Sequence, residues 1–464
     1  MKRRIACAGV AAVFILLAFT ALRPPSTPGG GARDLQAYLA AGHAYARGED
    51  PYGTRIARYE PAIATQTGAM LPFVGTPASL PFWALLARLP YATVHWTWEG
   101  VLVLSLAALA FASARLAGAP SGFDAACALL LTLSFAPADS AVALGQTAIV
   151  AAAAAALAVA MASRMTLGLG SFAALVLQPN LAPAVLAALR RHRTAPIIAS
   201  AAVVFALACV AAVGPGRLFA YAAVLRAHAH AEAGSLLQFT PAAVAASLGA
   251  FGMLLAALSI ALGVAAAFLA IRAALRTRDA GAGFAALGLA LPFCTGFFHF
   301  HDLAIVDAGV IFCLCRVPAR WFGPVLLATV AAGTNWLDIA QSHAAFAQDA
   351  ALALALILAA CALRAQLDRS AMLYAFAAAA LVVCGAAIAL HDPLPVWPDA
   401  MRPFHPHAAL SAAQQWRIEL QRTGLLAPNA GSALLRALAL AGCAVLLLSV
   451  TRTSDIDVHD RVER

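Results

Sequence analysis

The chain has 464 residues, of which 63% are hydrophobic and only 11% are charged. A soluble globular domain carries about 25% charged residues, so this composition excludes an ordinary soluble protein. The net charge of +9 comes from basic residues scattered between apolar segments, and it therefore indicates membrane topology rather than affinity for nucleic acid. Apolar stretches long enough to cross about 30 Å of hydrocarbon recur throughout the chain. The sequence predicts an all-α polytopic membrane protein.

The chain begins with MKRRIACAGVAAVFILLAFTAL, in which the basic residues Lys2 to Arg4 precede an apolar segment. Both secretory signal peptides and first membrane spans have this pattern. The sequence RPPSTPGGG follows in place of a small-residue cleavage site, which favours an uncleaved span at about 5–22. The long segment 23–91 is then expected outside the cytoplasm.

Placing the basic clusters on the cytoplasmic side predicts 12–14 spans in all. After the first, spans are expected near 92–114, 124–138, 145–163, 195–213, 250–271, 281–297, 303–316, 319–336, 349–365, 371–390 and 431–450. The substantial extracytoplasmic loops are then 23–91, 215–249, 337–348 and 391–430. The chain is predicted to be one transmembrane domain, 1–450, followed by a cytoplasmic tail, 451–464.

One apolar segment between Arg164 and the basic cluster RRHR (190–193) is too short for two full spans, although both flanks are expected in the cytoplasm. The tripeptide QPN interrupts this segment at 178–180. Pro179 removes a helical hydrogen bond and disfavours helix at Gln178. We therefore predict a broken helical hairpin whose break is buried in protein or lines a cavity.

The segment RDLQAYLAAGHAYARGEDPYG, residues 33–53, places a carboxylate, Asp34, soon after the first span and Tyr38 one helical turn later. Leu35 and Leu39 lie on one apolar face, which predicts a helix lying in the membrane interface. We interpret Asp34 as a catalytic base at the outer membrane surface. The alternative is that Asp34 only caps the helix.

A second outer constellation is TGFFHFHDLAIVDAG, residues 295–309, with His299, His301 and Asp302 at a turn and Asp307 deeper in the next segment. Ionisable groups at membrane depth are costly, and they therefore indicate function. Histidine can donate hydrogen bonds to a phosphate group. The alternative is that the three side chains cap a short loop in water.

Four further side chains are candidates for binding a substrate on the outer face: Tyr38, Gln146 in ALGQTA (143–148), Gln178 and Arg226. Three His-x-His pairs also occur, but a metal site needs three or four converging ligands, so we expect neither a metal nor a cofactor. A carboxylate, histidines and arginines on the outer face indicate a lipid-phosphate substrate, because ATP and nucleotide sugars are scarce there.

The segment 33–53 resembles the aspartate-to-tyrosine signature of glycosyltransferase family 87, the DUF2029 mannosyltransferase-like group of the GT-C superfamily. The residues at its key positions are Asp34, Tyr38, Ala41, Gly48, Pro51 and Tyr52. The segments LPFWALLARLPYATVHW, ALGQTAIVAAAAAALA, GLGSFAALVLQPN and FFHFHDLAIVDAGVI follow in the family's order. The resemblance covers about 35–315.

This resemblance implies a GT-C bundle that transfers a hexose, most commonly mannose, from a polyprenyl-phosphate donor on the extracytoplasmic side of the cell membrane. The sequence does not identify the acceptor, for which a lipid or a glycan is expected. The resemblance gives the catalytic-base role to Asp34, and it makes the turn of His299, His301 and Asp302 part of the donor-phosphate site. The chain departs from the family at Gln178, where lysine is common, and at VGTPASLP, which replaces a Tyr-Pro-Pro.

An inverting displacement suits these residues. Asp34 would accept the proton of the attacking acceptor hydroxyl, while His299, His301 and Arg226 would stabilise the leaving phosphate. Two other functions stay open. A transporter would use the broken hairpin and Asp307 at its substrate site, although no inverted repeat is visible. A catalytically inactive family member would act in assembly of envelope glycans.

Overall fold

The computed structural model describes residues 32–60, 71–118, 122–161, 163–190, 194–249, 252–277, 279–318, 321–334, 336–337 and 409–462, with a few positions between 373 and 391. Within these residues the chain is helical and has no strand. A single β-bridge there joins Gln238 to His299. The chain is therefore an all-α protein, as its composition predicts.

The first half of the chain forms short helices around one long one. Its elements are α2 (Arg33–Ala46), η1 (Thr54–Tyr59), η2 (Pro77–Ser79), α4 (Leu80–Leu86), α5 (Tyr91–Leu116), α6 (Gly122–Ser134), α7 (Ala136–Ala143), α8 (Ala148–Met161), α9 (Arg164–Leu177) and η3 (Ala182–Arg190). Helix α5 packs against α6 and α8, and α8 packs against α9.

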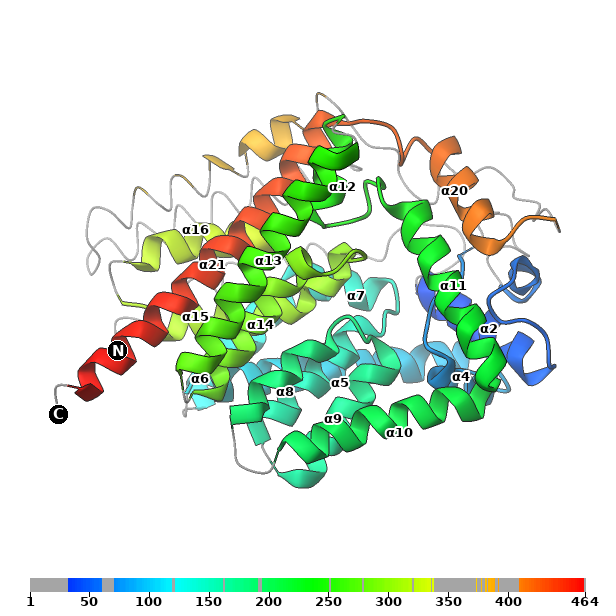
Figure 1. The fold of residues 1–464 in the computed structure, drawn as a ribbon, viewed down its shortest axis with the longest axis horizontal. Helices are drawn as coiled ribbons and strands as arrows, with labels where there is room; N and C mark the ends of the chain where they lie inside the picture. Colours follow the sequence, from blue (N-terminus) through cyan, green and yellow to red (C-terminus); the bar gives the residue numbers. More distant parts are fainter. Residues whose placement is uncertain are drawn as a thin grey trace.

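The second half adds longer helices. Its elements are α10 (Ala195–Val213), α11 (Pro215–Glu232), α12 (Pro241–Ser247), α13 (Gly252–Arg276), α14 (Ala280–Cys294), η4 (Phe300–Ile305), α15 (Val306–Arg316), α16 (Phe322–Gly333), α20 (Ala412–Arg422) and α21 (Ala430–Val462). Helices α13 and α21 run side by side across the molecule, and α11 rises from the end of α10 towards α20 (Figure 1).

Four described helices are long and apolar enough to cross a membrane: Tyr91–Leu116, Ala195–Val213, Met253–Arg276 and Ala430–Arg452. Helices α6 and α7, bent by 60° at their junction, make a fifth if they count as one span. The predicted spans 5–22 and 349–365 lie outside the described residues, and half of 371–390 lies outside them. The chain is a multi-pass membrane protein, whereas the total of 12–14 spans stays a prediction.

Helix α2 begins at Arg33, so Asp34 lies in its first turn and Ala32 occupies the N-cap position. The interpretation of Asp34 as a helix cap is therefore wrong. Most of α2 is buried, against α4, η1 and the turn between α7 and α8. This differs from the expected helix with one face on lipid, because small residues let protein pack closely around it. A Cβ at Gly42, for example, would lie 2.5 Å from the backbone of Trp83 in α4.

The predicted break at QPN is present. Helix α9 ends at Leu177 with Gln178 as its C-cap, and the chain turns through Pro179 and Asn180. The next element, η3, packs on α9, α8 and α14. The two arms have 14 and 9 residues. Both are shorter than the roughly 20 residues of a full span. At the break Gln178 and Asn180 are half-buried and Pro179 is exposed.

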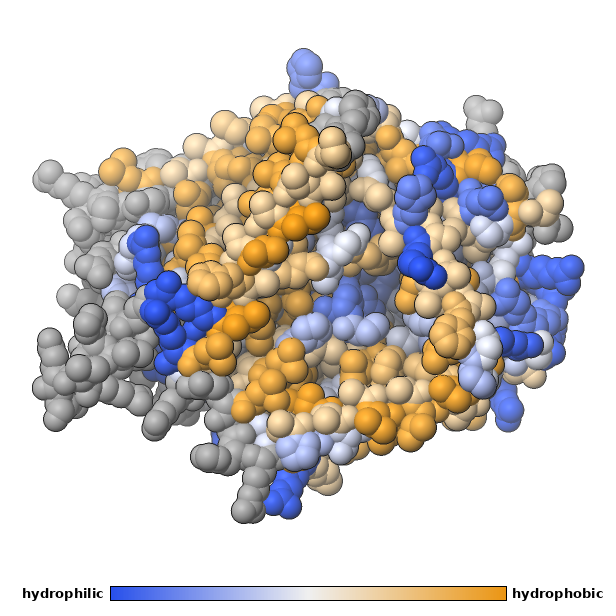
Figure 2. Space-filling view, in the orientation of Figure 1, coloured by the Kyte–Doolittle hydropathy of each residue, from blue (hydrophilic) through white to orange (hydrophobic). Residues whose placement is uncertain are grey.

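Helices α10 and α13 are the most exposed of the long apolar helices, with 11% and 17% of their apolar windows buried. Figure 2 shows a depression between these two helices whose floor is hydrophilic and whose walls are hydrophobic.

Candidate functional site

The centre of the candidate site is a chain of three side chains from two segments that lie far apart in sequence. Gln146 donates a short hydrogen bond through Nε2 to Oδ2 of Asp34. The hydroxyl of Tyr38 donates to Oε1 of the same amide, with 2.6 Å between the oxygens. The phenol fixes which way the amide faces, so Gln146 presents its N–H group to the carboxylate. The structure thus brings together three of the residues that the sequence predicts.

The turn between α7 and α8 places Gln146 beside Asp34. The backbone N–H of Asp34 donates to the carbonyl of Leu144 (3.0 Å), and that of Ala32 donates to Ala143 (3.0 Å). Gly145 in this turn has φ +73°, and a Cβ there would lie 2.9 Å from the Cβ of Ala32. Glycine is required both by its backbone conformation and by this close approach.

A second set of hydrogen bonds begins beside Gln146. The hydroxyl of Thr147 donates to Oε1 of Gln178 (3.2 Å), and Nε2 of Gln178 donates to Oδ1 of Asp302 (2.8 Å). Asn180 donates to the other carboxylate oxygen (3.2 Å). The break after α9 therefore supplies two neutral amides, from Gln178 and Asn180, that bind the carboxylate of Asp302. A lysine at position 178 would supply a positive charge to this carboxylate instead.

His299 lies at the next step of this network. Its backbone N–H donates to Oδ2 of Asp302 (3.0 Å), and its Nε2 donates to Oε2 of Glu232 at the end of α11 (2.9 Å). Glu232 also accepts from Nε2 of Gln238 (2.6 Å) and from the indole of Trp416 in α20 (2.5 Å). The polar network thus continues from α2 through η4 to α20, the helix before the C-terminal helix α21.

Burial is the main influence on Asp34, and it raises the pKa of the carboxyl group to about 6. The hydrogen bond from Gln146 and the charges of His299 and Arg33 act in the opposite direction. A carboxyl group with this pKa is largely ionised at neutral pH and is more basic than an exposed aspartate. Such a group suits general-base catalysis, which works best when the pKa lies near the working pH.

Burial and mutual pairing act in opposite directions on the pKa values of Glu232 and His299. Burial alone would raise the pKa of Glu232, but the charge and hydrogen bond of His299 outweigh it, and the pKa lies below its ordinary value. Burial alone would lower the pKa of His299, but Glu232 outweighs it, and the pKa is raised. His301 differs, since burial and the neighbouring His299 hold its pKa well below the usual range. The surroundings therefore favour the charged form of His299 and the neutral form of His301.

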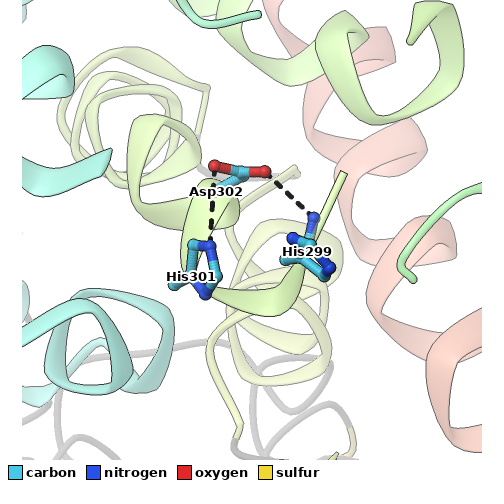
Figure 3. A group of neighbouring side chains, drawn as sticks. All are labelled: His299, His301 and Asp302. Atoms are coloured by element: carbon cyan, nitrogen blue, oxygen red, sulfur yellow. Dashed lines mark hydrogen bonds and ion pairs between the residues drawn. The ribbon is translucent and has the colours of Figure 1, made fainter. Parts of the chain in front are cut away.

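His299, His301 and Asp302 also meet the distance requirement of a cation site, with one ligand atom from each lying within 4.8 Å of the others. Figure 3 shows the Asp302 carboxylate above the two histidines, interacting with both. Both oxygens of Asp302, however, accept hydrogen bonds from protein groups, and Nε2 of His299 is bound to Glu232. The group is therefore a hydrogen-bonded cluster whose carboxylate is satisfied by protein donors.

Two predicted residues lie apart from this network. Arg226 is on an exposed side of α11. Asp307 is buried in α15, where one of its oxygens accepts a hydrogen bond from Thr132 of α6 (2.7 Å). The network also includes four side chains that sequence reasoning missed: Thr147, Asn180, Glu232 and Gln238. Trp416, an aromatic residue of the C-terminal predicted loop 391–430, is buried and donates to Glu232.

Comparisons of this chain with protein-family models, with curated proteins and with solved structures find no match.

Proposed function

We propose that the protein is an integral-membrane glycosyltransferase that moves a hexose, most commonly mannose in the family it resembles, from a polyprenyl-phosphate donor to an extracytoplasmic hydroxyl. The observation that carries this proposal is Asp34: a single carboxylate, oriented by Gln146, with a pKa raised to about 6 and a charged histidine close enough to affect it. The sequence resemblance supplies the reaction class.

In the proposed reaction the acceptor oxygen attacks the anomeric carbon of the donor sugar. Asp34 takes the proton from that oxygen as the new carbon–oxygen bond forms. The bond between the anomeric carbon and the phosphate oxygen breaks, and its electron pair stays on the phosphate. A single displacement of this kind inverts the configuration and needs no second catalytic carboxylate, unlike a retaining hydrolase.

The departing polyprenyl phosphate gains negative charge, which a donor site must stabilise. His299 is the cation nearest to this role in the network, and neutral His301 can donate one further hydrogen bond. Arg226, which the sequence also offers for this role, is exposed on α11, so it is left out of the proposal.

The hydrophilic depression between α10 and α13 supports a donor with a hydrocarbon chain (Figure 2). Both helices expose apolar side chains, among them Leu207 in α10 and Phe268 in α13. A polyprenyl tail would remain against such side chains while its head group reached polar residues. We infer that these contacts orient the donor.

The test is transfer from a panel of radiolabelled polyprenyl-phosphate sugars to a membrane extract, with the purified protein in lipid. We expect a product from one donor, and loss of at least about 100-fold in rate with Asp34→Asn, since a general base contributes factors of that size. Asparagine keeps the size of the side chain and can still accept from Gln146. Each assay is run with and without a divalent-cation chelator.

Asp124→Asn is the matched control, because Asp124 lies in the first turn of α6, away from the network. It should keep the wild-type rate. Product that persists in Asp34→Asn contradicts the assignment of Asp34. A folded wild-type protein that binds polyprenyl phosphate but forms no product with any donor would instead favour the inactive assembly role. Passage of the donor across a sealed bilayer without product would favour a transporter.

A further inference from the structure

We propose that Glu232 is a positioning residue for the donor phosphate, which holds His299 as a charged and oriented hydrogen-bond donor and joins α20 to the same site through Trp416. This inference rests on the proposed function, because it gives His299 the phosphate of the donor. Glu232 would not touch the substrate. It would act only through His299.

The first argument is the environment of the Glu232 carboxylate. The residue is 3% exposed, yet three side chains from three different segments donate to its two oxygens: His299, Gln238 and Trp416. A buried carboxylate without donors would cost several kcal/mol, so this convergence fixes the ionised form in one place. Hydrogen bonds with an ionised partner are also about twice as strong as neutral ones. The bond to Glu232 therefore restricts the orientation of the His299 ring.

The second argument is that groups other than Glu232 also hold the surrounding backbone. Oε1 of Gln238 accepts from the backbone N–H of Phe298 (2.8 Å), and the N–H of Phe239 donates to the carbonyl of Phe298 (2.7 Å). Arg436 of α21 donates to the carbonyls of Ser235 (3.1 Å) and Gln238 (2.9 Å). Neutralising Glu232 would therefore change the charge and the orientation of the His299 ring while the turn that carries it stays in place.

The third argument is that the ring of His299 has a second nitrogen to offer. Glu232 occupies Nε2. An imidazolium carries an N–H on each nitrogen, so Nδ1 then donates to another acceptor. The side chain of His299 is 19% exposed, whereas that of Glu232 is almost closed off at 4%. The phosphate can reach the histidine, and the carboxylate stays behind it.

Several charged or titratable groups face His299 from the elements packed around it. They are Glu232 and His228 of α11, His301 and Asp302 of η4, and Asp34 of α2. Of these, Glu232 makes the direct contact with the ring nitrogen. Asp302 is already occupied by the two amides and by the backbone of His299.

The experiment compares Glu232→Gln with wild type in the same lipid. Glutamine keeps the volume and can still accept from Trp416, but it removes the charge beside His299. We expect the KM for the donor to rise on the order of ten-fold, as for loss of one charge-assisted hydrogen bond, with a smaller change in kcat. The alkaline limb of the pH profile of kcat/KM should move to lower pH, because a histidine without its carboxylate loses its proton sooner.

A direct measurement follows the ring resonances of His299 against pH in ¹⁵N-histidine-labelled protein. The titration should move to lower pH in Glu232→Gln. Trp416→Phe keeps the aromatic packing and removes one donor to Glu232, so it should shift both readouts by a smaller amount, and it serves if Glu232→Gln fails to fold. Glu99→Gln is the matched control, because it removes a carboxylate that pairs with His95 (3.1 Å) on α5.

Identical titration of His299 and an unchanged donor KM in Glu232→Gln would overturn the inference. Equal shifts in Glu99→Gln would do the same, since the effect would then not be local. A wild-type protein that transfers no sugar would refute the proposed function alone, because the resonances of His299 would still report whether Glu232 controls it.

Discussion

Asp34 is subject to two influences that act in opposite directions on its affinity for a proton. Burial favours the neutral acid, whereas the N–H group of Gln146 favours the carboxylate, and burial dominates. Tyr38 contributes indirectly, because its hydroxyl keeps the amide of Gln146 facing the carboxylate. Burial also raises the pKa of Tyr38, so it remains a phenol and a hydrogen-bond donor.

The pH dependence of transfer follows from this balance. A base must be ionised, so kcat/KM should fall as the pH drops through about 6, the pKa of Asp34. Gln146→Leu removes a donor that stabilises the ionised form, so the pKa should rise and the acid limb should move to higher pH. The measurement is the pH profile of kcat/KM for wild type and for Gln146→Leu.

Tyr38→Phe is the matched control for this prediction. It removes the contact with Oε1 of Gln146 and leaves the donor to Asp34 in place. Its acid limb should therefore move less than that of Gln146→Leu. Coincident acid limbs in all three proteins would mean that another group carries the titration.

Residues that neighbour one another along the chain were predicted better than those brought together by the fold. Asp34 and Tyr38 are one turn apart, and Asp302 directly follows the predicted histidines, so local spacing was sufficient. Glu232 gave no such signal in RAHAHAE, since its partners come from η4 and α20. The helical periodicity of α11 explains why Arg226 is not part of the network. His228 precedes Glu232 by four residues and lies on the same buried side of α11, whereas Arg226 lies on an exposed side.

At the scale of elements, the site depends on how α2 meets the turn between α7 and α8. A turn is present at the predicted position, 143–148, and the start of α2 is fixed to it by two backbone hydrogen bonds. The surroundings of α2 could not be predicted, because an alanine-rich helix fits equally well against lipid or against protein. The break after α9 was predictable, because proline acts on its own local backbone.

The close approach at Gly145 can be tested with a matched pair of substitutions. Gly145 and Gly48 have nearly the same φ, +73° and +72°, but a Cβ at Gly48 would meet nothing within 4 Å. Both changes to alanine should cost roughly 1–2 kcal/mol for the left-handed backbone. Gly145→Ala should in addition push α2 away and lower the transfer rate by more than about ten-fold, since an ångström of misplacement has large effects.

The readouts are the melting temperature and the transfer rate of each variant. Equal loss of activity in Gly48→Ala and Gly145→Ala would show that backbone strain alone matters. Equal retention of activity would show that the start of α2 tolerates the displacement.

At the scale of the whole molecule, composition was enough to predict a helical membrane protein. It could not give the number of spans, because helices such as α14, with 15 residues, are apolar but shorter than a bilayer requires. Helix α14 is almost entirely buried among other helices. A short helix buried inside a bundle and a short membrane span are equally hydrophobic in sequence. Only the helices or lipid that surround them distinguish the two.

The hydrophilic depression between α10 and α13 predicts how the proposed transfer would depend on the amount of lipid (Figure 2). A substrate that enters sideways is diluted by lipid and not by water. At a fixed amount of protein and donor, adding inert phospholipid should therefore slow transfer, and the rates should fall on one curve when plotted against the mole fraction of donor. Rates that follow the bulk molar concentration would place the entrance on the aqueous side. The effective concentration of the donor would then be set by its mole fraction in the lipid of the vesicle.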